Sequence, residues 1–157
     1  GNAHQNVVPY QVFKASDGYL ILAVGNDSQF RSFANAIGQP ELGTDPRFAT
    51  NRMRVTNRGE LIPMLEKIIL TGKRDEWIDK MEVARVPCGP IQSIDQVFAH
   101  PQVKYRKIWQ TIPHPVAGSS PTTASPMRFS ATPIQYRRHA PLLGEHTQEV
   151  LKELLGR

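Results

Sequence analysis

The chain has 157 residues, of which 39% are hydrophobic and 21% are charged, a balance typical of a folded domain and not of a disordered segment. The net charge of +5 would suit nucleic acid, but the basic residues are not interleaved with aromatic side chains, so we expect a solvated basic surface without a nucleic-acid partner. One cysteine excludes an internal disulfide and favours the cytoplasm, and no apolar run approaches the roughly 20 residues that cross a membrane, so we expect no membrane partner.

The first elements along the chain are predicted to be a β-hairpin and an amphipathic helix. Strand-like runs flank Asp17–Gly18, a pair that favours a tight reversal because both residues tolerate positive φ. The run over residues 19–24 is nearly all apolar, which predicts a strand covered on both faces. We expect Asn26, Asp27 or Ser28 to cap the helix that follows. Its buried stripe is predicted from the spacing i, i+3, i+4 and i+7, which selects Phe30, Phe33, Ala34 and Ile37.

Helices are also predicted through the middle of the chain. Asp45–Pro46 is typical of a helix start, since proline is favoured in the first turn. A longer helix is expected to begin at Thr56 or Asn57 and to end at Thr71–Gly72, and a further helix follows it. The apolar positions of these two helices are Leu61, Ile62, Leu65, Ile68 and Ile69 in the first and Trp77, Ile78, Met81 and Ala84 in the second.

The second half of the chain is predicted to contain shorter elements, because nine of the 13 prolines follow residue 86. Pro87–Pro90 is interpreted as a rigid break between elements. Ser93 and Gln96 form a capping-box pattern, which predicts a short helix over residues 94–99.

Strands are expected at residues 108–112 and 127–129, and residues 113–126 are predicted to be a loop without a core pattern. The run Ala140–Thr147 is interpreted as the entrance to a final helix. The apolar residues of that helix recur at helical spacing and are Val150, Leu151, Leu154 and Leu155.

Together these elements predict an α+β fold. A small antiparallel sheet starts with a β-hairpin and packs with several helices, and an extended proline-rich C-terminal tail and a final helix follow. We place the small α+β domain at residues 7–112. Residues 113–157 are predicted to be a return segment with a C-terminal helix, because this tail has no obvious place to pack within so small a unit.

Candidate catalytic residues are few, and each has a structural alternative. Glu145 and His146 are an adjacent acid and histidine, but neighbouring residues at a helix start point in different directions, so we favour helix capping over chemistry. Cys88 has no adjacent lysine or histidine to lower its pKa and is interpreted as a buried structural thiol. His4 lies in a polar segment before the first strand, where ligand contacts often occur. No spacing predicts a metal site.

The motifs taken in order resemble the family III CoA-transferases, a group that includes formyl-CoA, carnitine and succinyl-CoA-dependent transferases and the related α-methylacyl-CoA racemases. The resemblance covers essentially the whole chain and rests on the ordered series of motifs. These motifs are Gly1–His4, Val8–Phe13, Ala15–Tyr19, Leu22–Asp27, Asp45–Phe48, Pro87–Pro90, His114–Pro115, Pro126–Ser130 and Pro141–Thr147.

The resemblance implies an incomplete catalytic unit. Family members are about two and a half times as long, and a large Rossmann-like domain binds most of the CoA and supplies a catalytic aspartate. No residue here matches that aspartate, so we carry over no catalytic residue, expect no cofactor on this chain alone and take a coenzyme A thioester as the substrate of the complete enzyme. A loop that closes over the active site just before the first strand corresponds to Gly1, Asn2, Ala3 and His4.

The resemblance also sets the expected partners. Family members form interlocked dimers, so we expect contact with a large domain or self-association as a homodimer. The chain alone is expected to be inactive, which leaves its status as an enzyme open. The alternatives are a stand-alone interaction module or part of an acyl-CoA racemase. Asn26–Ser28 is more similar to the transferases, because the racemase branch has an acidic residue and a proline in this segment.

Overall fold

The computed structural model describes residues 1–156 and divides into two compact units, Gly1–Gln92 (unit 1) and Ser93–Arg157 (unit 2). Both units are built from helices and small antiparallel sheets, which confirms the predicted α+β class. Among the described residues, no helix is long and apolar enough to cross a membrane. The domain ranges 7–112 and 113–157 concern packing in a longer protein, and they stay a prediction.

The sheet of unit 1 has the strand order β1–β2–β3 and is antiparallel throughout. Strands β1 (Tyr10–Lys14) and β2 (Tyr19–Ala23) form the predicted hairpin, with Tyr10 opposite Ala23 and Lys14 opposite Tyr19. Strand β3 (Cys88–Ile91) pairs with β2, so the segment interpreted as a rigid break is an edge strand. An edge strand tolerates a proline because one row of its backbone groups needs no partner.

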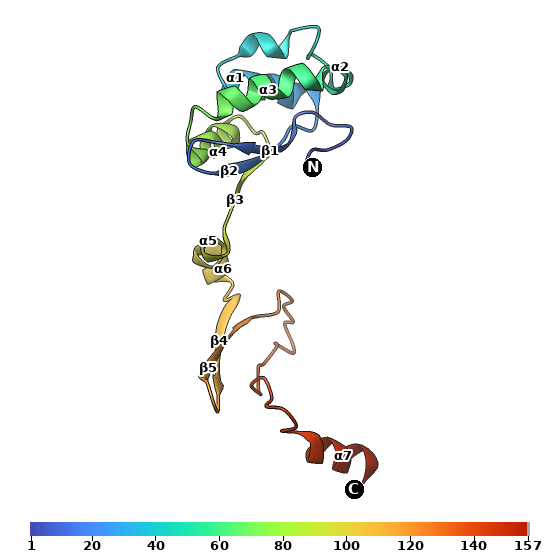
Figure 1. Ribbon diagram of the computed structural model, residues 1–157, viewed down its shortest axis with the longest axis vertical. Helices are drawn as coiled ribbons and strands as arrows, with labels where there is room; N and C mark the ends of the chain where they lie inside the picture. Colours follow the sequence, from blue (N-terminus) through green and yellow to red (C-terminus); the bar gives the residue numbers. More distant parts are fainter. Residues whose placement is uncertain (157) are drawn as a thin grey trace. The chain divides into compact units, whose positions relative to one another are not determined.

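The prediction that β2 is covered on both faces is wrong. Leu20 and Leu22 are buried beneath the helices, whereas Tyr19 on the opposite face is 49% exposed and Ile21 is half-buried. The sheet therefore has one helix-covered face, as Figure 1 shows. An antiparallel sheet commonly packs one face against the core and leaves the other face exposed to solvent.

The hairpin turn lies where it was predicted, but positive φ is not the reason for it. Neither Asp17 nor Gly18 has positive φ, and a four-residue turn closes with the Ala15 N–H donating to the Gly18 carbonyl at 2.8 Å. Asp17 instead accepts the Arg74 N–H at 2.7 Å. It thereby satisfies a free donor at the start of a distant helix, which explains an aspartate here.

The helices of unit 1 follow the predicted stripes. Helix α1 (Asp27–Ala36) is capped by Asn26, whose Oδ1 accepts the Gln29 N–H at 2.9 Å, and Gly38 ends it with φ of 75°. A 3-10 turn (Pro40–Gly43) follows. Residues 45–49 make only one further turn, and the helix predicted from Asp45–Pro46 begins later, as α2 (Asn51–Thr56).

Two further helices complete unit 1. Helix α3 (Arg58–Ile69) begins after Asn57 as predicted and tolerates Pro63 near its start. Helix α4 (Arg74–Val83) buries Trp77 and Met81. The Trp77 indole N–H donates to the Ile69 carbonyl at 2.8 Å, which ties α4 to the end of α3.

The hydrophobic core of the described residues lies entirely within unit 1. It joins the inner face of the sheet to α1, α3 and α4. Its fully buried side chains include Phe13, Leu20, Leu22, Phe30, Phe33, Phe48, Leu61 and Leu65. The predicted helix stripes therefore supply much of the core, and the sheet supplies the rest.

Unit 2 contains short helices and a second hairpin. Helix α5 (Ile94–Ala99) has the predicted capping box, and α6 (Pro101–Tyr105) follows His100. Strands β4 (Trp109–His114) and β5 (Gly118–Thr123) pair antiparallel, with Trp109 opposite Thr123. The loop predicted at residues 113–126 is therefore largely a strand, and residues 127–129 are not one. Helix α7 (Thr147–Leu155) is the predicted final helix.

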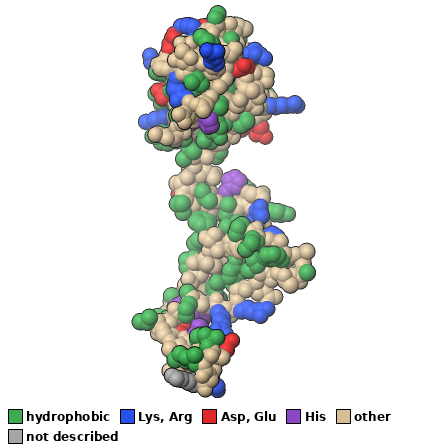
Figure 2. Space-filling view, turned by 90° about the vertical axis from the view of Figure 1, so that its right-hand side faces the viewer, with side chains coloured by type: hydrophobic (Ala, Val, Ile, Leu, Met, Phe, Trp, Pro, Cys, Tyr) green, Lys and Arg blue, Asp and Glu red, His purple; other side chains and the backbone are tan. Residues whose placement is uncertain are grey.

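Unit 2 exposes much of its apolar surface, and Figure 2 shows hydrophobic side chains gathered on it. Among its described residues Ala124 is the one buried hydrophobic residue. The large exposed side chains are Ile94, Tyr105, Trp109, Val116, Met127, Phe129, Ile134, Tyr136, Leu142, Leu143, Val150, Leu151, Leu154 and Leu155. Apolar exposure on this scale is typical of a surface that another polypeptide covers.

Candidate functional site

The N-terminal segment, residues 1–6, is exposed but tied to the first strand. The side-chain Oδ1 of Asn2 accepts the Val12 N–H at 3.0 Å. The His4 N–H donates to the Tyr10 carbonyl at 2.8 Å. The segment predicted to face a substrate therefore runs back along β1 and has a defined backbone path.

Helices α2 and α3 hold the same segment from the other direction. Arg58 donates from Nη2 to the carbonyls of His4 at 2.9 Å and Gln5 at 2.7 Å. Asn51 donates from Nδ2 to the Asn6 carbonyl at 2.8 Å and accepts the Val8 N–H at 3.1 Å. The side chains of Arg58 and Asn51 therefore bond four backbone groups within residues 4–8.

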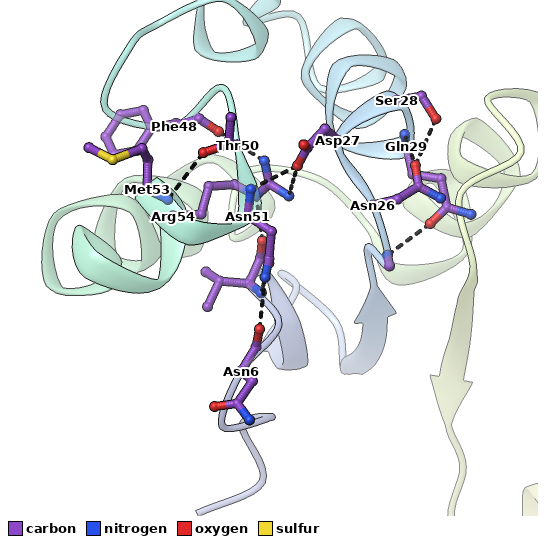
Figure 3. Close-up of polar contacts among 12 residues, drawn as sticks. Asn6, Asn26, Asp27, Ser28, Gln29, Phe48, Thr50, Asn51, Met53 and Arg54 are labelled. Atoms are coloured by element: carbon purple, nitrogen blue, oxygen red, sulfur yellow. Dashed lines mark hydrogen bonds and ion pairs between the residues drawn. The ribbon is translucent and has the colours of Figure 1, made fainter.

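A fully buried arginine, Arg54, anchors the end of this segment (Figure 3). Its Nε donates to the Val8 carbonyl at 2.6 Å, and its Nη1 donates to the Phe48 carbonyl at 2.9 Å. Its Nη2 bonds Asp27 Oδ1 at 3.0 Å, and the guanidinium lies 4.3 Å from the ring centroid of Phe30. Burial lowers the pKa of the Arg54 guanidinium, and the hydrogen bond to Asp27 opposes that shift.

Asp27 joins the anchor to the start of α1. Its Oδ1 also accepts the Asn51 N–H at 2.7 Å, so one carboxylate oxygen binds both the first N–H of α2 and the Arg54 side chain. Asp27 lies in the first turn of α1, where a negative charge is favourable. The N-terminal segment, α1 and α2 therefore share one polar network, which Figure 3 shows around Asn51 and Arg54.

The imidazole of His4 is oriented as well as its backbone. Its Nδ1 accepts the Asn6 N–H at 3.1 Å. Its ring stacks on Tyr10 with 5.3 Å between centroids and an interplanar angle of 22°. An exposed histidine with two ring contacts and two backbone contacts presents its remaining edge in a defined direction.

The other candidate residues have local structural partners. Burial raises the pKa of the half-buried Cys88 thiol to about 11, which makes it a poor nucleophile at neutral pH. Glu145 accepts the Leu142 N–H at 2.8 Å and faces His139 at 3.4 Å. His146 faces Glu149 at 3.7 Å, so the adjacent acid and histidine have separate partners. In residues 1–156 no three His, Cys, Asp or Glu side chains gather as metal ligands would.

The family resemblance points to Gly1–His4, and neither the resemblance nor a sequence pattern points to Asn51, Arg54 and Arg58. The arginines were expected to form part of a solvated basic surface, whereas Arg54 is buried and Arg58 bonds the segment. The signal present in the sequence is their spacing of four residues, which would place both on one side of a continuous helix, but α2 ends at Thr56 and α3 begins at Arg58. Nothing in that spacing identifies backbone carbonyls as their partners, because three of these four carbonyls are 46 or more residues away in the sequence.

Comparisons with known proteins agree over nearly the whole chain. Residues 1–147 match the family described as CoA-transferase family III. The succinate–glutarate CoA-transferase of Agrobacterium fabrum is 40% identical over 154 residues, which are 98% of this chain and 38% of that protein. The succinyl-CoA:glutarate CoA-transferase of Homo sapiens is 37% identical over 155 residues, which are 99% of this chain and 35% of that protein.

A solved structure shows the same likeness in three dimensions. The crystal structure of a CAIB/BAIF family protein from Brucella suis is 40% identical and superimposes with a TM-score of 0.79. The match covers 98% of this chain and 39% of that protein. The chain thus spans less than two fifths of the length of each of these three relatives.

Proposed function

Because the chain belongs to CoA-transferase family III, we propose that it is the small-domain part of an enzyme that moves CoA from an acyl-CoA thioester to a free organic acid. The observation that carries this proposal is the match of residues 1–147 to the family in one continuous stretch. The substrate is a coenzyme A thioester, and the chemistry needs no further cofactor on this chain.

The organic acids are proposed to be dicarboxylates. The Agrobacterium and human relatives, at 40% and 37% identity, are named for transfer between succinate and glutarate. Both acids carry one carboxylate that can accept CoA and a second one that remains free. The exposed, fixed segment Gly1–His4 is the proposed contact of this chain with the substrate.

The catalytic work is proposed to be divided between this chain and a larger domain. The relatives are more than twice as long as the matched region, and the resemblance places no catalytic aspartate on residues 1–157. The exposed apolar side chains of unit 2 support a second polypeptide surface that covers them, in a homodimer of the complete enzyme. The chain alone is therefore proposed to be inactive.

The test compares the full-length protein that carries residues 1–157 with the 157-residue chain alone. Each is incubated with succinyl-CoA and glutarate, and glutaryl-CoA is measured by chromatography, with pentanoate as an acceptor of equal length and one carboxylate. We expect the full-length protein to form glutaryl-CoA and the chain alone to form none. Formation by the chain alone would contradict the division of work, and no transfer by a folded full-length protein would contradict the proposed function.

A further inference from the structure

His4 has a ring edge that no contact in the structure explains. Its Nδ1 and its ring face are engaged by Asn6 and Tyr10, whereas Nε2 lies on the exposed side chain beyond these contacts. We propose that the Nε2–H of His4 binds the free carboxylate of a dicarboxylate substrate, the one that does not exchange CoA. This inference rests on the proposed function and assigns His4 as a specificity-determining residue.

The hydrogen bond from Asn6 fixes where the imidazole proton lies. A backbone N–H is always a donor, so Nδ1 of His4 accepts the Asn6 N–H with its lone pair at 3.1 Å. A neutral imidazole that accepts at Nδ1 carries its proton at Nε2. The outward edge of the ring is therefore a hydrogen-bond donor, and its natural partner is an oxygen acceptor such as a carboxylate.

The ring is held in place before any ligand arrives. The His4 N–H donates to Tyr10, and the His4 carbonyl accepts from Arg58 at 2.9 Å, so the backbone is fixed on both sides. The ring stacks on Tyr10. A donor whose rotamer is already fixed loses little conformational entropy on binding, which favours affinity.

The charge next to His4 suits an anion. The Arg58 guanidinium bonds the His4 carbonyl directly, and only its Nη2 atom makes the two bonds to the segment. The positive charge of Arg58 thus lies against the backbone of His4, and a positive charge in the neighbourhood of a site favours an anion there. Arg58 thus acts as a positioning residue for His4 and adds favourable potential.

The proposed role predicts a particular kinetic change. The free carboxylate keeps its charge and its bonds throughout CoA transfer, so its contact with His4 contributes equally to ground state and transition state. Loss of such uniform binding raises KM and leaves kcat unchanged. Loss of the His4 contact affects only acceptors that have a second carboxylate, so we expect the KM for pentanoate to stay unchanged.

The experiment uses the full-length protein that carries residues 1–157, with His4→Ala, His4→Gln and His4→Asn variants. The glutamine amide places an N–H near Nε2, whereas the shorter asparagine can replace only Nδ1. We expect His4→Ala and His4→Asn to raise the KM for glutarate about tenfold to hundredfold, the loss expected for a hydrogen bond to a charged group. We expect His4→Gln to stay within about threefold of the wild type.

A matched control is His100→Ala, since His100 Nδ1 likewise accepts an N–H two residues ahead, from Gln102 at 3.1 Å. We expect its KM to be unchanged. The inference is overturned if the wild type transfers CoA to glutarate and His4→Ala does so with the same KM. It is also overturned if the His4→Ala variant raises the KM for glutarate and the KM for pentanoate by the same factor. A wild type that transfers no CoA to glutarate overturns the proposed function, and the inference falls with it.

A second measurement does not depend on activity. Long-range ¹H–¹⁵N spectra of the 157-residue chain report which imidazole nitrogen of each histidine bears the proton. We expect His4 to show the proton at Nε2. A proton at Nδ1 would overturn the inference even if the full-length protein proved to be an active transferase.

Discussion

At the scale of single residues, the buried charge of Arg54 determines how the N-terminal segment is held. Its three partners are two backbone carbonyls and Asp27, which is itself 42% exposed, so the ion pair is buried on one side only. A guanidinium presents its donors in a rigid fork, and a lysine could not serve the same three acceptors. The burial of Arg54 cannot be predicted from the sequence, because tertiary packing brings its partners together.

Replacing Arg54 should destabilise unit 1 strongly. Arg54→Met removes the charge and leaves the buried carbonyls of Val8 and Phe48 without donors, so we expect a loss of about 3 kcal/mol in the free energy of unfolding. Arg52→Met is the matched control, since Arg52 lies exposed in the same helix, and it should change the value by less than about 0.5 kcal/mol. Urea unfolding with comparable m-values measures both, and equal midpoints for the two variants would refute the anchoring role.

At the scale of elements, hydrophobic periodicity predicted the helices better than the strands. The stripes of α1, α3 and α4 were visible because each helix buries one face against the same core. Strand β5 has the sequence Gly118–Thr123, which contains serines, threonines and a proline and no apolar alternation. Its pairing with β4 could not be predicted from such a pattern, because backbone hydrogen bonds and not side chains define it.

Two glycines, one just after a helix and one within a helix, should change stability in opposite directions when replaced by alanine. Gly38 follows α1 with φ of 75°, where an alanine is strained, so Gly38→Ala should destabilise by about 1 kcal/mol. Gly59 lies in the first turn of α3, where an added methyl group would meet open space, so Gly59→Ala should stabilise by about 0.5 kcal/mol through helix propensity. Thermal unfolding of both variants tests this, and a shift of the same sign for both would contradict the helix assignments.

At the scale of the whole molecule, the two units differ in what stabilises them. Every member of the core cluster lies between Val8 and Met81 or at Val86, whereas unit 2 has secondary structure with little buried apolar surface. The predicted domain, residues 7–112, includes the first residues of unit 2, and its range stays a prediction. Counting apolar residues could not show that those of unit 2 remain exposed, since exposure depends on which surfaces are present to cover them.

Truncation should separate the two units. A chain that ends at Gln92 keeps the whole core cluster, so we expect cooperative thermal unfolding with a midpoint within about 4 °C of that of the 157-residue chain, a shift that corresponds to about 1 kcal/mol. Near-ultraviolet circular dichroism follows the transition, and in the truncated chain Trp77 is the one tryptophan that contributes to it. A broad, non-cooperative transition in the truncated chain would show that unit 2 is needed for the packing of unit 1.

The network around Arg54 also imposes an order of assembly during synthesis. Arg54 bonds Val8, which leaves the ribosome 46 residues earlier, or about 2 to 9 s at ordinary rates of translation. During that interval residues 1–8 lack their contacts with α2 and α3, although the β1–β2 hairpin, which bonds Asn2 and His4, can already form. Residues 1–8 therefore dock on α2 late, and their final position depends on a side chain that has yet to be translated.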